Sequence, residues 1–290
     1  MKESLWQRLC RGARRLRQQP RWGRFVGAGW ADRIMQVPVT DRFHAKQGRT
    51  IGRWVLQAGE ERLVVYLKRH YRLPRLHGWL ALLRPDGGWS PALQEWEHLA
   101  WARACGLPVP AALAAGEYIG PWGRLQSFLA VEELTGMVPL HEAIPAAAAR
   151  LDSAAFARWK RTLIAELARL VRRLHRRHCF HKDLYLCHFY IPQEDTARLP
   201  SWRGRVHVID LHRLGRHRWT AWFWQGKDLA QLLYSSEIAG VGARDRLRFW
   251  RAYLGPRRRS VRGRALAWCI RLRWWRYRRH NARRGRPPGG

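Results

Sequence analysis

A polar loop between a long helix and a pair of apolar strands constrains the fold of this chain more than any other feature. Between 156 and 174 the apolar residues recur every three or four positions, which predicts a helix with one core-facing stripe. The loop that follows begins at 181–183 (His-Lys-Asp), and strands are expected around 189–191 and 206–209, the second leading to Asp210. Because each acidic residue stands beside a regular element, the fold can hold both carboxylates in fixed positions.

This layout suits phosphoryl transfer, which needs a positioned hydroxyl group, a metal ion on the phosphates and a cation that orients them. Asp183 could accept the proton of the hydroxyl group, and Asp210 offers the carboxylate oxygen that Mg²⁺ prefers. Upstream, Lys68 ends an apolar strand and could contact the phosphates. Either Glu95 or Glu97, on the next predicted helix, could form an ion pair with that lysine. The order of these elements predicts a kinase.

The region before residue 135 predicts an antiparallel sheet with a helix. Turn residues separate short runs of alternating apolar and polar residues, and a Ser-Pro pair is a typical helix start. The expected elements are a hairpin (50–56 and 62–68), a helix from Ser90–Pro91 to Cys105, strands at 118–119 and 125–131, and a hinge at 132–136.

The charge of the chain is extreme. Its 290 residues include 55 Lys and Arg against 21 Asp and Glu, a formal net charge of +34. Such a protein is attracted to polyanions, whether nucleic acid, anionic membrane or phosphorylated glycolipid, and charge alone does not choose among them. The 18 Trp residues, many beside Arg, suit either arginine stems packed over indoles or a membrane interface.

Both ends of the chain are strongly basic. Residues 1–30 form a basic leader in which Leu5, Leu9, Ala13 and Leu16 have helical spacing up to Pro20. Residues 256–290 form an Arg-rich tail that predicts a basic amphipathic helix, whose apolar face either packs on the protein or contacts a membrane. That apolar face comprises Val261, Ala265, Trp268, Cys269, Leu272 and Trp275.

The cysteines and the absence of long apolar runs indicate the compartment. Five scattered cysteines give no disulfide framework, which fits a reducing environment. The basic N-terminus lacks the apolar core of a signal peptide, and no uncharged run reaches membrane-spanning length. We expect a cytoplasmic protein that is peripheral to a membrane.

From about residue 43 to 235, the chain resembles the lipopolysaccharide core heptose kinase family, whose members have a protein-kinase-like fold. The block 181–191 is the most specific, because its Tyr-x-Cys-His-Phe part is absent from protein kinases. The resemblance implies ATP and Mg²⁺, and a heptose hydroxyl group of a lipid-linked core at the inner face of the inner membrane as the acceptor. It rests on 66–70, 94–96, 106–110, 127–128, 132–134, 181–191, 209–213 and 227–230.

The fold that the resemblance implies is α+β with two lobes. An N-lobe, 31–134, would hold an antiparallel sheet plus one helix, and a mainly helical C-lobe would span 135–255. The leader (1–30) and the tail (256–290) would flank these lobes, and the tail has no counterpart in the resemblance. We expect leader and tail to bind the anionic membrane surface, which makes nucleic acid an unexpected partner.

The resemblance also assigns roles by position. Lys68 would orient the phosphates of ATP with Glu95 as its partner, Asp183 would be the base, and Asp210 would bind Mg²⁺. Asp228 would support the loop by accepting backbone N–H bonds.

Two histidines of the loop are assigned from their positions. His181 is expected to brace the loop backbone. His188 stands where protein kinases place a metal-binding Asn, and because imidazole is a poor Mg²⁺ ligand we expect it to bind the acceptor or a phosphate. The phosphate-covering turn offers only Gly48 and Gly52, which is weaker than a Gly-rich loop.

Four other interpretations stay open. The histidines and cysteines between 175 and 188 could bind zinc, although their spacing fits no standard finger. The Arg-Trp pattern would suit a non-catalytic protein that binds nucleic acid or membrane. The substrate could be another core sugar or a small molecule. A pseudokinase is disfavoured by the presence of Lys68, Asp183 and Asp210.

Overall fold

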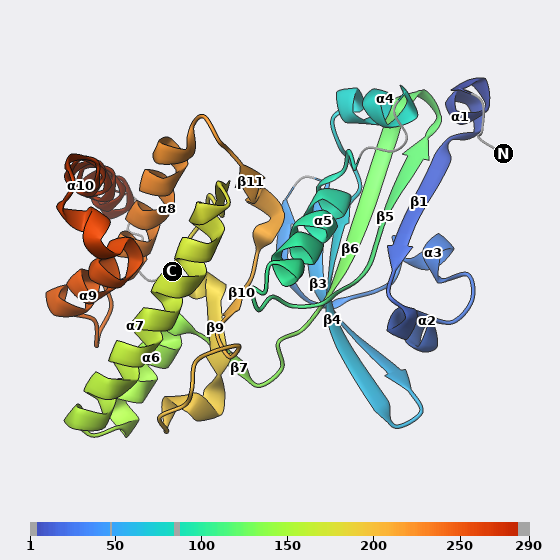
Figure 1. Ribbon diagram of the computed structural model, residues 1–290. Coiled ribbons are helices and arrows are strands. Elements are labelled where there is room, and N and C mark those ends of the chain that lie inside the picture. The colour runs from blue at the N-terminus through green and yellow to red at the C-terminus, as the bar shows by residue number, and fades with distance from the viewer. Residues whose placement is uncertain (1–4, 47, 84–87, 284–290) are drawn as a thin grey trace. The chain divides into compact units, whose positions relative to one another are not determined.

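The antiparallel sheet expected in the first half of the chain is present in the structure, a computed structural model that describes residues 5–46, 48–83 and 88–283 (Figure 1). The chain forms two units: Met1–Cys105 with Pro110–Leu134, called here the N-terminal unit, and Gly106–Val109 with Thr135–Gly290, the C-terminal unit. Each unit is described separately.

The N-terminal unit contains a six-stranded sheet in the order β1-β5-β6-β4-β3-β2, with every neighbouring pair antiparallel. Besides the expected helix α5, the described residues of this unit include four shorter helices. The strands are β1 (Ala13–Gln18), β2 (Thr40–Lys46), β3 (Arg49–Ala58), β4 (Glu61–His70), β5 (Ala112–Gly120) and β6 (Arg124–Glu132). The helices are α1 (Leu5–Arg11), α2 (Pro20–Val26), α3 (Trp30–Arg33), α4 (Arg75–Leu83) and α5 (Pro91–Ala104).

Strand alternation builds the core of this unit. On β4, Leu63, Val65 and Leu67 are buried at every second position, as expected for a strand with one face in the core. Trp22 of α2 is fully buried against the same core, and its ring meets that of Trp54 edge to face at 5.8 Å. Helix and sheet therefore hold β4, and with it Lys68, in a packed environment.

The single helix predicted for the leader is wrong from residue 13 onward. Helix α1 ends at Arg11, and Gly12 has φ +77°, a left-handed conformation that Gly adopts readily at the end of a helix. Residues 13–18 instead form β1, which pairs with the edge of β5, and the missing side chain of Gly116 makes room for Leu16. Long-range pairing has overridden the local helical spacing.

The C-terminal unit is mainly helical, as expected. The long helix α7 is amphipathic, and α9 packs along it. Its helices are α6 (Leu140–Arg150), α7 (Ser153–Arg176), α8 (Ala221–Ser235), α9 (Ala243–Leu254) and α10 (Val261–Ala282). Short strands form two small sheets, ordered β10-β9-β7 and β11-β8: β7 (Met137–Pro139), β8 (Cys179–Phe180), β9 (Phe189–Pro192), β10 (His207–Val208) and β11 (Gly215–Arg216).

The tail forms the expected helix, α10, but its buried face differs from the one predicted. Helix α10 packs on α8 and on the turn Gly255–Arg259 and buries Gly263, Leu266, Cys269 and Ile270, so only Cys269 of the predicted apolar face is buried. A Cβ at Gly226 of α8 would lie 3.5 Å from the Cys269 sulfur, which shows how closely the helices approach. The remaining predicted residues form what we call the exposed stripe: Val261, Ala265, Trp268, Leu272 and Trp275. Residues 284–290 of the tail lie outside the described part.

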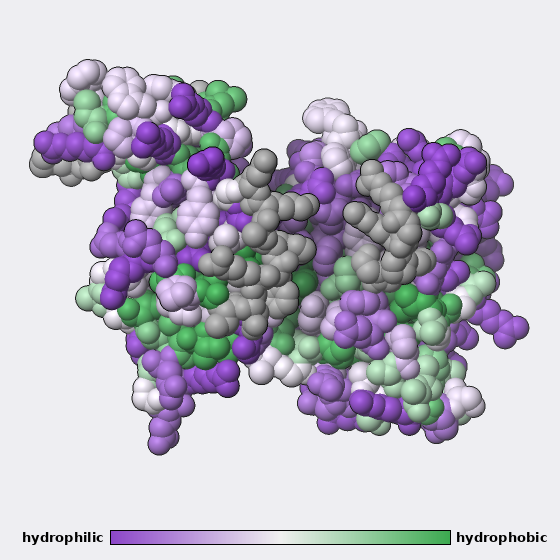
Figure 2. Space-filling view, turned by 180° about the vertical axis from the view of Figure 1, so that it is seen from behind, coloured by the Kyte–Doolittle hydropathy of each residue, from purple (hydrophilic) through white to green (hydrophobic). Residues whose placement is uncertain are grey.

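Tryptophan occupies both environments that its frequency suggested. Trp22, Trp159 and Trp202 are buried, whereas Trp219 is fully exposed. Arginine also stacks on indole in the tail, where the Arg279 guanidinium lies 4.3 Å from the centre of the Trp275 ring. Figure 2 shows separate hydrophobic patches within a largely hydrophilic surface on the face seen from behind. Within the described residues, no helix is both long and apolar enough to cross a membrane.

Candidate active site

Lys68 and Glu95 are in direct contact in the N-terminal unit. The Lys68 Nζ lies 2.6 Å from Glu95 Oε1, and the two side chains are 13% and 5% exposed. Strand pairing fixes the lysine, because β4 lies between β3 and β6. Helix α5 carries the glutamate and is capped by Ser90, whose hydroxyl accepts a hydrogen bond from the Leu93 N–H. The alternative partner, Glu97, is exposed.

Asp183 lies in the loop between β8 and the short turn Leu186–His188 of the C-terminal unit. Its Oδ2 accepts a hydrogen bond from Arg213 at 2.8 Å, and its Oδ1 accepts one from the Gln231 amide at 3.3 Å. The carboxylate is 22% exposed, so solvent and substrate can reach it. Arg213 is half exposed and forms the most accessible part of this arrangement.

A buried carboxylate fixes the backbone of the same loop. Asp228, on α8, is fully buried and accepts the backbone N–H groups of His181 and Lys182, each at 2.8 Å. Lys182 has φ +68°, a conformation that costs energy for a non-Gly residue, and these bonds stabilise it. The structure therefore places Asp228 where the resemblance expects a supporting carboxylate.

The two histidines of the loop are oriented by backbone carbonyl groups. His181 donates from Nε2 to the Ile209 carbonyl at 2.9 Å, and His188 donates from Nδ1 to the Asp183 carbonyl at 2.6 Å. Their rings stack with centroids 5.4 Å apart. Burial lowers the pKa of His181, and its Nδ1 has no hydrogen-bond partner, so both features favour the uncharged form of the ring. His188 thus directly positions the backbone of Asp183.

Asp210 follows β10 in a left-handed conformation, with φ +61°. His212 Nδ1 donates to its Oδ1 at 2.7 Å, and His188 Nε2 lies 3.9 Å from its Oδ2. The side chain is 29% exposed. Within the described residues no three His, Cys, Asp or Glu side chains gather into a metal cluster. Proteins commonly bind Mg²⁺ with one or two carboxylates plus phosphate oxygens and water, and Asp210 fits that donor set.

Four residues of the site were not predicted: Lys227, Arg213, His212 and Gln231. Lys227 donates to the backbone carbonyl of Lys182, and burial lowers its pKa although the nearby Asp183 opposes this. Arg213 and Lys227 stand inside sequence blocks that resemble the family, and Gln231 lies one helical turn beyond Lys227. That turn is the only signal that could have found Gln231 from sequence.

The zinc interpretation finds no support in the geometry of the described residues. His175 bonds to Asp228 and Tyr253, and His181 and His188 bond to backbone carbonyls. Cys179 is buried, and burial raises the pKa of Cys187, which disfavours a thiolate ligand.

Known proteins share this arrangement of elements. A family model described as the lipopolysaccharide kinase (Kdo/WaaP) family matches residues 43–253. The lipopolysaccharide core heptose(I) kinase WaaP of Pseudomonas aeruginosa is 35% identical over 183 residues, 62% of this chain and 66% of that protein. The WaaP of Escherichia coli K12 is 31% identical over 169 residues, 58% of this chain and 62% of that protein. The matches thus span just under two thirds of these relatives.

A solved structure also matches. WaaP in complex with acyl carrier protein aligns with a TM-score of 0.67 and 29% sequence identity, over 89% of this chain and 98% of that chain. This match and the observed elements confirm the expected α+β, protein-kinase-like fold. With the family model covering most of its length, the chain belongs to the lipopolysaccharide kinase (Kdo/WaaP) family.

Proposed function

We propose that this protein is an ATP-dependent kinase that phosphorylates a heptose hydroxyl group of the lipopolysaccharide inner core. The observation that carries the proposal is Asp183, an accessible carboxylate on a loop whose backbone Asp228 and His188 hold in place. The names of the relatives support heptose as the acceptor.

In this proposal the chain's own residues position the reactants. Lys68, oriented by Glu95, contacts the phosphates of ATP, and Asp183 accepts a hydrogen bond from the attacking hydroxyl group. Arg213 exchanges its bond to Asp183 for a bond to a phosphate oxygen. Mg²⁺, held by Asp210 and phosphate oxygens, would neutralise negative charge on the phosphates. His188 keeps the loop in register through the Asp183 carbonyl.

The test compares core oligosaccharide from cells with and without this gene by mass spectrometry. We expect the loss of one phosphate, and fragmentation of the intact molecule should place that phosphate on heptose. A phosphate on a different core sugar would favour a kinase that acts on that sugar instead of heptose. An unchanged core mass would contradict the proposal. Purified protein should then transfer the γ-phosphate of ATP to the core that lacks it.

We further propose that the basic leader and tail hold the enzyme on the anionic inner face of the inner membrane, where a lipid-linked acceptor is found. The exposed stripe of α10 supports this, because Trp268 is 68% and Trp275 is 48% exposed and no acidic residue occurs in the helix. Each Arg close to an anionic surface contributes about 1 kcal/mol before screening.

Vesicle binding tests the membrane proposal. Trp268→Ser with Leu272→Ser should weaken sedimentation with anionic vesicles, and binding should fall as salt is raised. Leu266 faces α8 and is left intact, so the fold is kept. Equal binding to neutral and anionic vesicles would contradict the proposal.

Acyl carrier protein is the partner in the solved relative, and we propose it as a partner of this chain. The alignment to almost the whole of that chain supports the suggestion. Co-elution of the two purified proteins in size-exclusion chromatography tests it, and separate elution at micromolar concentration would contradict it.

A further inference from the structure

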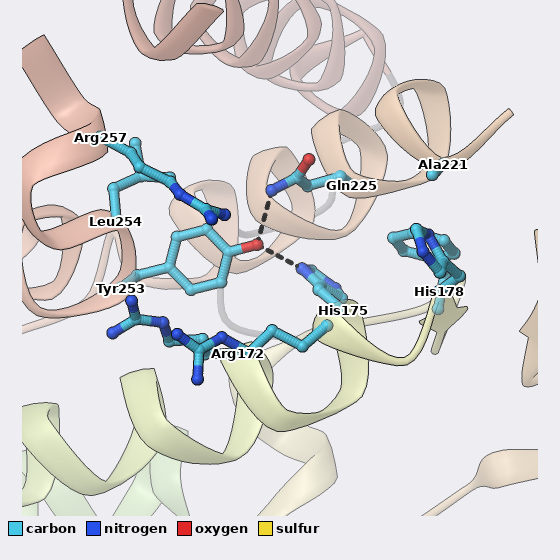
Figure 3. Close-up of a pocket in the computed structure, with 10 residues that line it drawn as sticks. Arg172, His175, His178, Ala221, Gln225, Tyr253, Leu254 and Arg257 are labelled. Carbon is cyan, nitrogen blue, oxygen red and sulfur yellow. Dashed lines mark hydrogen bonds between the residues drawn. The ribbon is translucent and has the colours of Figure 1, made fainter. Parts of the chain in front are cut away.

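A cavity of about 420 Å³ in the C-terminal unit gathers arginines that no acidic residue balances. It lies where the end of α7, the start of α8 and the end of α9 meet (Figure 3). Arg172 and Arg176 come from α7, and Arg257 comes from the turn Gly255–Arg259 that follows α9. None of the ten lining residues is Asp or Glu.

The charges around this cavity differ from those elsewhere in the unit. Within the described residues, the structure shows no ion pair for Arg172, Arg176 or Arg257, whereas buried Asp195 pairs with two arginines. The last turn of α7 favours cations through the helix dipole, which accounts for Arg176 but not for Arg172, one residue before that turn. It does not account for Arg257, which a separate element brings to the same cavity. The three arginines that line this cavity carry like charges, which repel one another, and a bound anion would offset that repulsion.

A chain of hydrogen bonds connects the wall of this cavity to the catalytic loop. The Gln225 amide donates to the Tyr253 hydroxyl at 2.8 Å, and a hydrogen bond of 2.6 Å joins that hydroxyl to His175 Nδ1. His175 Nε2 donates in turn to Asp228 at 3.2 Å. Figure 3 shows Tyr253 between Arg172 and Arg257, with its hydroxyl group pointing toward His175 and Gln225.

Acceptor requirements fix one direction along this chain. Asp228 already accepts the backbone N–H groups of His181 and Lys182, and since a carboxylate only accepts, His175 Nε2 donates to it. A shift of Tyr253 therefore reaches, through one imidazole, the carboxylate that holds the loop. Neither Asp183 nor Asp210 lines the cavity.

We propose that this cavity binds a phosphate group through Arg172, Arg176 and Arg257, and that the bound phosphate acts on the catalytic loop through Tyr253 and His175. Guanidinium groups bind phosphate oxygens in pairs, and several of them suit a doubly charged group better than a single carboxylate. The volume exceeds that of a bare phosphate ion and suits a phosphorylated sugar. Such a group is available free in solution or on a phosphorylated glycolipid.

Calorimetric titration of the full-length protein tests the binding site. The probes are inorganic phosphate, glucose 6-phosphate, and lipopolysaccharide micelles before and after chemical dephosphorylation. Arg172→Gln with Arg257→Gln should weaken binding of the effective probe by about tenfold or more, because two charged hydrogen-bond donors are lost. The control is Arg244→Gln with Arg251→Gln, which removes the same charge from exposed positions of α9.

The outcomes separate the sources and the site. Binding of the small phosphates identifies a free ligand, and binding of phosphorylated micelles alone identifies a glycolipid. Equal losses in the two double variants would show diffuse attraction to a basic protein and overturn the site. Should the first double variant fail to fold, Arg257→Gln alone, at an exposed position, gives the same comparison with Arg251→Gln.

Hydrogen exchange at the His181 and Lys182 amides tests the connection. Adding the phosphate probe that binds in the titration should change the exchange rates of these two amides in the natural protein. It should not change them in Tyr253→Phe, which keeps the ring and lacks the hydroxyl group. An unchanged rate on binding to the natural protein would overturn the connection to the loop. Both measurements are made without ATP, so no phosphate is transferred during them. Inorganic phosphate and glucose 6-phosphate contain no heptose, so the result with these two probes does not depend on the proposed kinase activity.

Discussion

Two ion pairs of similar length have opposite surroundings in the two units. Lys68 and Glu95 are 2.6 Å apart and almost fully buried, whereas Arg213 and Asp183 are 2.8 Å apart with 51% and 22% of their side chains exposed. A buried pair cannot lose one member without leaving a charge in the core, but an exposed pair can open into water at little cost. The first pair is thus a permanent part of the fold, and the second is an exchangeable contact.

The position of Asp183 does not depend on its exposed partner. The loop backbone is held by Asp228 and by the His188 ring, both of which are independent of Arg213. Lys68, in contrast, obtains its orientation from Glu95 and from the strand itself. The cation of the N-terminal unit is fixed by its counter-ion, and the carboxylate of the C-terminal unit is fixed by its backbone.

The substitution Asp183→Asn is expected to have the largest effect, which is a loss of catalytic rate. Loss of the base should lower kcat by about a thousandfold or more, since general bases contribute about 10²–10⁴. The melting temperature should change little, because the loop is held elsewhere. Initial rates of phosphate transfer, together with calorimetric melting, measure both. Glu194→Gln, at an exposed carboxylate of the same unit, is the matched control. Full activity in Asp183→Asn would contradict the assignment.

The second largest effect is expected when the buried pair, Lys68 with Glu95, is broken. Glu95→Gln should lower the free energy of unfolding by about 3 kcal/mol and lower activity as well, because the buried Lys68 ammonium group loses the negative charge of Glu95 beside it. Adding Lys68→Met should restore part of the stability and none of the activity. Urea unfolding of the natural protein, the two single variants and the double variant completes a double-mutant cycle. A coupling energy near zero would show that the pair is not permanent.

Sequence predicted the residues of both pairs that stand beside strongly patterned elements. Lys68 lies near the end of the apolar strand β4 and Asp183 follows an amphipathic helix, so local periodicity placed both. Periodicity left Glu95 and Glu97 as alternative partners, and the family resemblance selected Glu95. Arg213 is different, because its role depends on how a three-residue turn brings it back to a residue 30 positions earlier. No periodicity records such a contact.

The same limit explains the errors elsewhere in the fold. Residues 13–18 have helical spacing, yet the edge of β5 offers hydrogen bonds that a local pattern does not reveal. Helix α10 is apolar on more than one face, and only packing against α8 decides which face is buried. The arginine cavity joins Arg172 to Arg257, 85 positions apart in sequence, through the packing of α9 on α7.

A smaller effect is expected for the exposed pair. Arg213→Gln should change the free energy of unfolding by less than about 1 kcal/mol, as is usual for accessible ion pairs. Amide exchange at His181 and Lys182 should stay slow, because Asp228 still accepts both N–H groups. Urea unfolding and exchange measured by mass spectrometry test this. If Arg213→Gln lowered the free energy of unfolding by about 2 kcal/mol, or if those amides exchanged fast, the exposed pair would contribute to the fold as the buried pair does, and the proposed difference between them would be wrong.

A third pair, Arg53 with Glu133, lies between these extremes in exposure, and its small effect is distinguished by its pH dependence. Two hydrogen bonds of 2.8 and 2.9 Å join the groups, and the bond from Arg53 lowers the pKa of Glu133 below its ordinary value of 4.5. A carboxyl group with a lowered folded-state pKa contributes stability that is fully present above its ordinary pKa. That contribution disappears as the pH falls through the folded-state value.

Glu133→Gln therefore tests the intermediate pair through its pH dependence. At pH 7 the variant should be less stable than the natural protein by about 1 kcal/mol or less, because the pair is partly exposed. Below pH 4.5 the two proteins should converge, since protonated Glu133 resembles Gln. Urea unfolding between pH 7 and pH 3 measures the difference. A difference in stability that stays constant across this pH range would mean that the Glu133 side chain contributes through packing. The comparison of ion pairs would then hold only for the other two pairs.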